Sequence, residues 1–313
     1  MPVPLILDCD PGHDDAFAIL LAAGSPDVDI RAITTVAGNG TLDRVTLNAR
    51  KVCTLAGLRD VPIAAGAAGP LRGKLEPAVD VHGESALDGP ALPDPEMPLD
   101  DRRADELIVE ILRGSAERVT LVPTGPLTNI ARVLQRAPDV RENIREIVWM
   151  GGSTGRGNRT PYAEFNAWVD PTAADIVFTS GLPLTMVGLN LTHQALATPE
   201  IVARIRGVGG DLGRIAADWL GFFSATYREL WGFDAPLHDP CALALAFVPD
   251  LARSVDSFVA VETDGRWTRG ATVVDLHNRL REPPNARVPV ELDVARFWDL
   301  VVEALKRIGE RAR

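Results

Sequence analysis

The chain has 313 residues, of which 46% are hydrophobic and 24% charged, as in globular proteins and unlike disordered or coiled-coil chains. Its formal net charge of −11 argues against nucleic acids and anionic membranes as partners, because both attract basic surfaces. The three cysteines form no disulfide framework or zinc pattern, and the longest apolar run, residues 16–23, is far shorter than the about 20 residues of a membrane span. Because the N-terminus also lacks the pattern of a signal peptide, we expect a cytoplasmic protein.

Short apolar runs alternate with helical segments through the first 190 residues. The apolar runs are 3–7, 30–36, 61–64, 119–122, 144–149 and 184–187. The helical segments between them are 14–23, 43–57, 105–113, 127–136 and 171–180. Strands separated by helices are typical of βαβ units. The pattern therefore predicts an α/β fold of the Rossmann-like kind, with one open, mostly parallel sheet and helices on both of its faces.

Other segments complete the expected organisation. Two long loops rich in glycine, residues 66–101 and 151–163, interrupt the alternation, and loops of this length are usually functional or disordered. Residues 211–230 are amphipathic and helical, and the elaborated C-terminal part mixes strands with a final helix over 295–308. We find no repeat or linker, so we expect a single domain over residues 1–313. Ligands of such sheets bind beyond the carboxyl ends of the strands, which makes the loops there the expected place for chemistry.

An acidic segment follows the first strand. Asp8, Asp10, Asp14 and Asp15 put four carboxylates into eight residues. Capping of the next helix accounts for one or two of them, but not for four. Crowded carboxylates repel one another unless a cation neutralises them, and oxygen ligands favour Ca²⁺ or Mg²⁺ over Zn²⁺. The sequence therefore predicts a site for a hard divalent cation.

Later segments offer further polar groups. Asp239, after His238, either caps a helix or adds another carboxylate to the cation site. Thr124 ends the fourth strand, where the Gly-Pro turn that follows can aim a backbone carbonyl at a cation. Glu164 and Asn166 lie in a long loop, and by themselves they predict positions on the surface.

These segments together resemble the nucleoside hydrolases of the inosine-uridine preferring type. The matching motifs are DCDPGHDDA at 8–16, TTVAGN at 34–39, VHGES at 81–85, TGPLTN at 124–129, MGG at 150–152, AEFN at 163–166, DP at 170–171 and LHDP at 237–240, with PPN at 283–285. The resemblance implies an enzyme that hydrolyses the N-glycosidic bond of ribonucleosides to free base and ribose. It also implies a small-molecule nucleoside substrate and a homodimer or homotetramer.

The resemblance assigns a cofactor and a catalytic base. Asp10, Asp15, Asp239 and the backbone carbonyl of Thr124 would hold Ca²⁺. The ion would also bind the 2′- and 3′-hydroxyls of ribose and the attacking water. Asp10 would act as the general base on that water, and its direct attack would invert the anomeric carbon.

Four further residues would bind the sugar, and a fifth would lie beside the metal. By the resemblance, Asp14 and Asn166 would hold the ribose diol, and Asn158 and Glu164 would hold the 5′-hydroxyl. Asn39 would lie beside the metal and its water. The sugar gains positive charge as the bond breaks, so surrounding carboxylates would stabilise it.

The base would leave near His238, whose pKa suits proton donation to a leaving group. His82 matches the histidine that marks the inosine-uridine preferring branch, although a surface histidine in a glycine-rich loop fits its surroundings equally well. Tyr227 and Trp231 lie four residues apart on one helix face, where they would either stack on the base or belong to the core. A tyrosine is more usual at 231, and tryptophan has no hydroxyl proton to pass on, which argues against a Tyr–His relay from that position.

Two other functions remain as alternatives. A Mg²⁺-dependent aspartyl phosphohydrolase also carries Asp-x-Asp after its first strand, but here Pro11-Gly12-His13 follows, and the chain has only three lysines for a phosphate. A non-catalytic nucleoside or ribose binder would keep the same scaffold. The presence of all the proposed metal and base residues argues against the binder.

Overall fold

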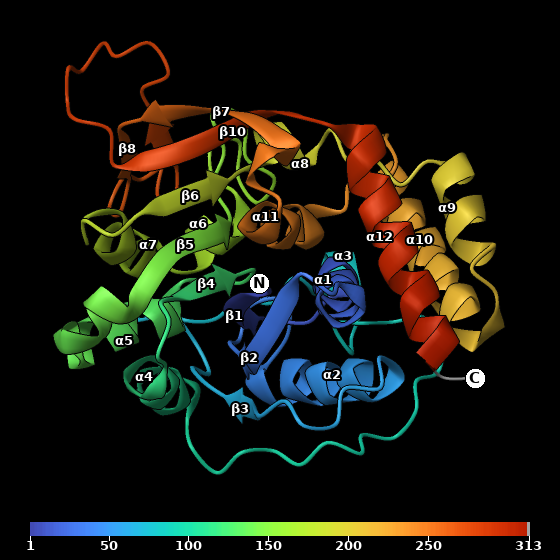
Figure 1. Ribbon diagram of the computed structural model, residues 1–313. Helices are drawn as coiled ribbons and strands as arrows, with labels where there is room; N and C mark the ends of the chain where they lie inside the picture. The colour runs from blue at the N-terminus through green and yellow to red at the C-terminus, as the bar shows by residue number, and fades with distance from the viewer. Residues whose placement is uncertain (312–313) are drawn as a thin grey trace.

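The computed structural model describes residues 1–311 and contains an eight-stranded sheet in the order β3-β2-β1-β4-β5-β6-β10-β7 (Figure 1). The strands are β1 (Val3–Cys9), β2 (Val28–Thr35), β3 (Ile63–Ala65), β4 (Val119–Pro123), β5 (Ile144–Met150), β6 (Leu184–Val187), β7 (Ala252–Ser257) and β10 (Ala286–Leu292). All neighbouring strands run parallel except β7, which pairs antiparallel with β10. The predicted α/β class and mostly parallel open sheet are confirmed.

Helices cover both faces of the sheet (Figure 1). The longer ones are α1 (His13–Gly24), α2 (Leu42–Leu55), α4 (Ala104–Gly114), α5 (Thr128–Arg136), α7 (Pro171–Phe178), α9 (Pro199–Arg206), α10 (Gly210–Trp231), α11 (His238–Phe247) and α12 (Val294–Arg311). The short ones are α3 (Val79–His82), α6 (Phe165–Val169) and α8 (Leu189–Thr192), with 3₁₀ turns η1 (Pro138–Asn143) and η2 (Pro249–Leu251). A hairpin of β8 (Val259–Val261) and β9 (Thr272–Val274) forms a separate two-stranded sheet.

Alternation along β1 produces the two cores. Leu5 and Leu7 point into one core, with α1, α10, α11 and α12, whereas Ile6 points into the other, with α4, α5 and α7. Successive side chains of a strand face opposite sides, so a strand covered on both faces is apolar throughout. This explains why the apolar runs of the sequence mark the strands so clearly.

The structure adds elements that periodicity did not predict. The long loop 66–101 contains α3, a single turn that carries His82. Four residues are too few to display a helical period, so this turn has no signature in the sequence. In the C-terminal part, β10 lies between β6 and β7, an order that depends on pairing between distant segments.

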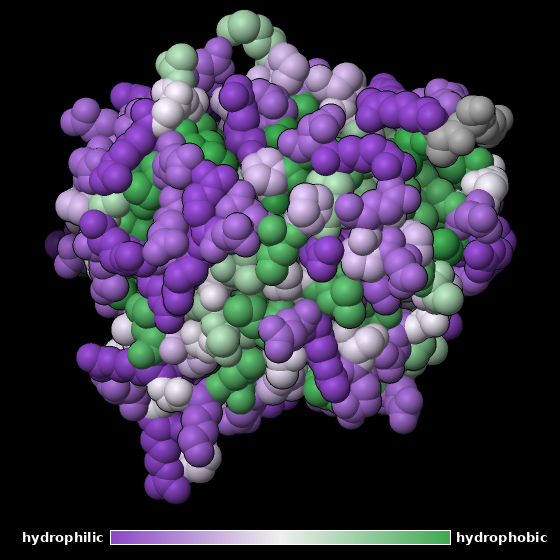
Figure 2. All heavy atoms as spheres, turned by 90° about the horizontal axis from the view of Figure 1, so that it is seen from below, coloured by the Kyte–Doolittle hydropathy of each residue, from purple (hydrophilic) through white to green (hydrophobic). Residues whose placement is uncertain are grey.

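The surface of the molecule carries both hydrophilic and apolar side chains. Figure 2 shows one face on which hydrophilic side chains predominate and apolar side chains appear between them. No helix within residues 1–311 is long and apolar enough to cross a membrane.

Helix α1 ends against α12 at Gly24, a fully buried position where an added Cβ would overlap backbone atoms of Ala304. We expect Gly24→Ala to lower the free energy of unfolding by about 1–3 kcal/mol, because backbone atoms cannot move aside cheaply. Gly221 is the matched control, since it lies inside α10 with no atom within 4 Å of its added Cβ. Urea denaturation of both variants tests this prediction. Equal stability of the two alanine variants would show that α1 and α12 are not closely packed there.

Candidate active site

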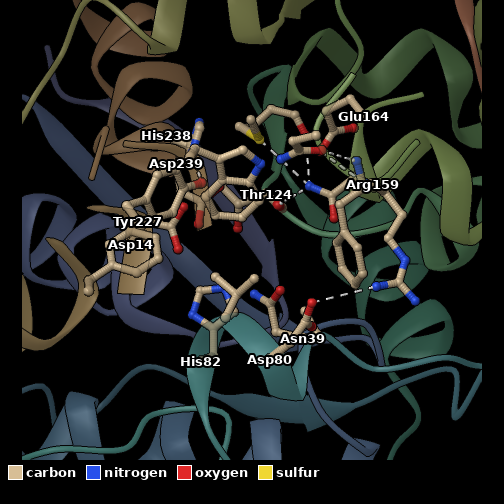
Figure 3. A pocket seen from close by; sticks show the side chains of 18 residues that line it. Asp14, Asn39, Asp80, His82, Thr124, Arg159, Glu164, Tyr227, His238 and Asp239 are labelled. Atoms are coloured by element: carbon tan, nitrogen blue, oxygen red, sulfur yellow. Dashed lines mark hydrogen bonds and ion pairs between the residues drawn. The ribbon is translucent and has the colours of Figure 1, made fainter. Parts of the chain in front are cut away.

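A cavity opens at the carboxyl ends of the parallel strands (Figure 3). Most of the predicted site residues line it, and they come from segments far apart in the chain. The lining residues with polar groups are Asp14, Asn39, Asp80, His82, Thr124, Asn158, Arg159, Glu164, Asn166, Tyr227, Trp231, His238 and Asp239. The two predicted residues outside this lining, Asp10 and Asp15, are fully buried and hydrogen-bonded to residues that line it.

Three carboxylates form the centre of the acidic cluster. One oxygen each of Asp14, Asp15 and Asp239 lies within 4.8 Å of the other two, and all three side chains are buried. Asp14 and Asp15 belong to the first turn of α1, and Asp239 belongs to the first turn of α11. Two helix N-termini therefore direct their positive dipole ends at this cluster, which partly offsets its negative charge.

Asp15 is held in place by four donors. Its Oδ2 accepts from the backbone N–H of Gly12 at 3.0 Å and from Nδ2 of Asn39 at 3.2 Å. Its Oδ1 accepts from the hydroxyl of Thr124 at 2.8 Å and from the backbone N–H of Asp10 at 3.2 Å. The loop after β1 and the end of β4 are thus tied to one carboxylate.

Asp10 lies beside this group. Its Oδ2 accepts from the backbone N–H of Asn39 at 2.7 Å, whereas its Oδ1 is buried without a hydrogen-bond partner among the described residues. Gly38 and Gly125 approach so closely that a Cβ at either position would contact the carboxylate of Asp10. Glycine at these two positions therefore leaves room for the Asp10 carboxylate.

Burial is the main cause of unusual pKa values in the cluster. It raises the pKa of Asp10 and of Asp239 well above the ordinary range, and neighbouring carboxylates add to the effect. Burial and the charge of Asp15 raise the pKa of Asp14 to about 8. A bound cation would favour the charged carboxylates and so lower these pKa values. Groups of oxygen ligands of this kind suit hard divalent ions. The unpartnered oxygens of Asp10 and Asp14 fit the same interpretation, so the aspartate cluster could bind a metal.

Glu164 and Asn166 are buried, so the surface positions predicted from their loop alone were wrong. Glu164 caps α6 and accepts from the backbone N–H groups of Gly152, Asn166 and Ala167 at 2.9–3.0 Å. Burial still raises the pKa of Glu164 to about 7.

Two amides join the neighbouring loops. Asn166 donates from Nδ2 to the carbonyl of Thr124 at 2.7 Å, which leaves that carbonyl one further lone pair. Asn158 accepts from the backbone N–H of Phe165 at 2.9 Å. The loop after β5 is therefore pinned over the end of β4.

Both ring nitrogens of His238 have partners. Nε2 lies 2.8 Å from the hydroxyl of Tyr227, and Nδ1 lies 2.7 Å from Oγ1 of Thr192. The tyrosine in contact with the histidine is therefore Tyr227. Its hydroxyl can take part in a Tyr–His relay, although the tryptophan at position 231 cannot. Trp231 is half-buried, with its ring 4.5 Å from that of Tyr227. Burial keeps the pKa of His238 well below its usual value.

His82 is also buried, so its alternative placement on the surface was wrong. Its ring stacks on Phe223 with centroids 5.3 Å apart. Its Nδ1 lies 3.1 Å from Nδ1 of His13, whose Nε2 lies 2.8 Å from the carbonyl oxygen of Asp88. The turn α3 thus presents His82 from the side of the cavity opposite His238 (Figure 3).

The sequence reasoning missed Asp80 and three other residues in or beside the cavity. Thr192 is the last residue of α8, the short helix after β6. Its position beyond the end of a strand was the only signal in the sequence that could have indicated it. His13 lies inside the motif at 8–16, but we predicted no function for it. Arg159 lines the cavity, stacks over Trp168 at 4.7 Å and forms an ion pair with Glu76 at 3.4 Å.

Similar structures define the class of protein. A purine-preferring ribonucleoside hydrolase from Gardnerella vaginalis superposes with a TM-score of 0.91 at 32% identity, covering 98% of this chain and 99% of that one. A plant nucleoside hydrolase superposes with a TM-score of 0.90 at 32% identity and the same coverage. The fold is that of nucleoside hydrolases.

Sequence comparison identifies the particular family. The model of the inosine-uridine preferring nucleoside hydrolases matches residues 5–299, and the chain belongs to this family of enzymes. The pyrimidine-specific ribonucleoside hydrolase RihA of Escherichia coli K12 is 48% identical over 308 residues, which are 98% of this chain and 99% of that protein. The resemblance inferred from the motifs is confirmed.

The raised pKa values predict how the metal-free protein responds to pH. A carboxyl group with a raised folded pKa keeps its proton after the unfolded chain has lost it, so stability falls as pH rises from about 4 through the folded pKa. Between pH 7 and 8 in EDTA, where the histidines of the unfolded chain are already mostly neutral, we expect the free energy of unfolding to fall by up to about 1.4 kcal/mol for each carboxyl that is still protonated in the folded state. Asp14 and Glu164, with pKa values of about 8 and about 7, contribute in this window.

Urea denaturation in EDTA at both pH values measures this fall. Asp14→Asn should make the dependence on pH shallower. A metal-free protein more stable at pH 8 than at pH 7 would contradict the prediction.

Proposed function

We propose that this chain is a Ca²⁺-dependent ribonucleoside hydrolase, which uses water to cleave a ribonucleoside into free base and ribose. The observation that carries the proposal is the buried group of Asp10, Asp14, Asp15 and Asp239, joined by no ion pair to any lysine or arginine among the described residues. Asp10, Asp15, Asp239 and the carbonyl of Thr124 would hold the ion. When bound, Ca²⁺ would neutralise these carboxylates and lower the pKa of a water molecule.

Asp10 is the proposed general base. Its Oδ2 is occupied by the N–H of Asn39, but its Oδ1 has no partner and is available to accept the proton of the attacking water. The interaction with Asn39 orients the carboxylate, which keeps Oδ1 directed away from that amide. Because a single water attacks the anomeric carbon directly, the product has the inverted configuration.

The sugar-binding residues surround the same cluster. Asp14, with a buried and unpartnered Oδ1, and Asn166 would hold the 2′- and 3′-hydroxyls. Asn158 and Glu164 would hold the 5′-hydroxyl, while Asn39 fixes Asp10 and Asp15. As the bond to the base breaks, these carboxylates would stabilise the positive charge that develops on the sugar in a site largely closed to water.

The base would leave on the side of Tyr227 and His238. These two groups are within hydrogen-bond distance of each other, and Trp231 beside them offers a ring on which the base can stack. His82 would face the base from the opposite side. The 48% identity to a pyrimidine-specific relative supports pyrimidine ribonucleosides as the preferred substrates.

The proposal also includes the domain organisation, the cellular location and the oligomeric state. The whole chain would act as a single domain, in the cytoplasm and as a homodimer or homotetramer. Of the two alternatives, a phosphohydrolase is disfavoured because the one Arg or Lys among the lining residues, Arg159, forms an ion pair with Glu76. A binder without activity is disfavoured by the complete set of proposed catalytic groups.

A ribose-release panel tests the activity. With Ca²⁺, we expect free ribose from uridine and cytidine at higher kcat/KM than from inosine and adenosine. EDTA should abolish release, and added Ca²⁺ should restore it. No ribose from any of the four nucleosides would refute the proposal. Phosphate release from sugar phosphates would favour the phosphohydrolase, and calorimetric nucleoside binding without turnover would favour the binder.

The role of Asp10 has its own test. Asp10→Asn keeps the shape of the side chain but removes the base, so we expect kcat to fall by about 10²–10⁴. Asp139→Asn is the control, because this exposed carboxylate pairs only with Arg113 on the surface. Steady-state kinetics with saturating Ca²⁺ give the comparison. An Asp10→Asn variant with unchanged kcat would rule out the assigned role.

A further inference from the structure

A chain of three buried groups ends at the base side of the cavity. Oγ1 of Thr192 lies 2.7 Å from Nδ1 of His238, and Nε2 of His238 lies 2.8 Å from the hydroxyl of Tyr227. All three side chains are buried: Thr192 is fully enclosed, whereas Tyr227 and His238 line the cavity. In Figure 3, Tyr227 and His238 lie together on one side of that cavity.

The hydroxyl of Thr192 decides the direction of these hydrogen bonds. Among the described residues, Nδ1 of His238 is the only hydrogen-bond partner of Oγ1 of Thr192. If Nδ1 carried a hydrogen and donated it, the hydroxyl hydrogen of Thr192 would be buried with no acceptor, which is costly. If Thr192 donates its hydroxyl hydrogen to Nδ1 of His238 instead, no hydrogen between these two side chains lacks an acceptor. The same reasoning disfavours a doubly protonated His238, because its Nδ1 would also carry a hydrogen.

The direction of the hydrogen bond at Nδ1 determines which ring nitrogen of His238 carries the hydrogen. A neutral imidazole that accepts at Nδ1 carries its hydrogen on Nε2. Nε2 then donates to the oxygen of Tyr227, which leaves the hydroxyl hydrogen of Tyr227 without a protein acceptor among the described residues. That hydrogen is free to turn into the cavity. With the opposite tautomer, Tyr227 would donate to His238 and offer the cavity only a lone pair.

We propose that Thr192 is a positioning residue, which sets the tautomer of His238 and so directs the hydroxyl hydrogen of Tyr227 toward the leaving nucleobase. This inference rests on the proposed hydrolysis of ribonucleosides. The base departs with the electron pair of the broken bond, and the hydrogen bond from Tyr227 stabilises the charge that develops on it. No proton leaves the chain of three groups, and the released base takes its proton from solvent.

The test compares two leaving groups in the Ca²⁺-loaded full-length enzyme. One substrate is the nucleoside that the ribose-release panel finds fastest. The other is p-nitrophenyl β-D-ribofuranoside, whose nitrophenolate leaves readily without help from a donor. For Thr192→Val we expect kcat on the nucleoside to fall about 10- to 100-fold, with little change on the nitrophenyl riboside. Thr192→Ser, which keeps the hydroxyl, should recover most of the nucleoside rate.

Three further variants extend the comparison. Tyr227→Phe should lower kcat on the nucleoside selectively in the same way. Adding Thr192→Val to this variant should lower kcat little further, because both changes remove the same hydrogen bond to the base. Thr120→Val is the matched control: it also removes a buried threonine hydroxyl, but one on β4 that has no partner. Both of its rates should equal those of the wild type.

The outcomes separate this inference from the proposed function. A wild-type enzyme that cleaves neither substrate would refute the hydrolase itself. An active wild type whose Thr192→Val variant loses both rates equally would show that Thr192 only supports the fold. A variant that keeps both rates would show that the hydroxyl does not orient the chain.

Discussion

Four buried carboxylates meet at the carboxyl ends of β1 and β4 and at the first turns of α1 and α11, and within residues 1–311 no basic side chain is paired to them. A group of this kind is unfavourable unless protons or a cation offset its charge. The surrounding structure therefore supplies what partial compensation it can. Two helix N-termini point at the group, and two backbone N–H groups, one hydroxyl and one side-chain amide donate to Asp15. The remaining free oxygens of Asp10 and Asp14 are the groups that a divalent ion and a sugar would use.

The two halves of the cavity are built differently. The half proposed to hold the sugar depends on strand ends and tight loops, in which Gly38 and Gly125 press against Asp10, so it tolerates little change. The half proposed to face the base consists of side chains from α3, α8, α10 and α11, joined by ring stacking and by the hydrogen bonds of His238. Similar structures named as purine-preferring and relatives named as pyrimidine-specific share this fold. That combination is expected if base preference depends on the second half.

Much of the fold could be predicted because strands buried on both faces are apolar throughout. The first six strands follow the apolar runs of the sequence, and α10 follows its amphipathic pattern. The turn α3 could not be predicted, since four residues carry no period. The insertion of β10 between β6 and β7 could not be predicted either, because pairing of distant strands depends on packing rather than on local preference.

The site divides in the same way. Asp10, Asp14 and Asp15 stand within one short motif, so the sequence by itself determined an acidic, oxygen-rich site beside the first strand. Only the tertiary structure decided that Glu164 and Asn166 are buried, because their partners lie in loops brought together by the sheet. Thr192 and His238 are separated by 46 residues, and the hydrogen bond between them has no trace in either segment. Local residue chemistry determined which charges the site contains, and three-dimensional packing decided which hydrogen-bond donors and acceptors face one another.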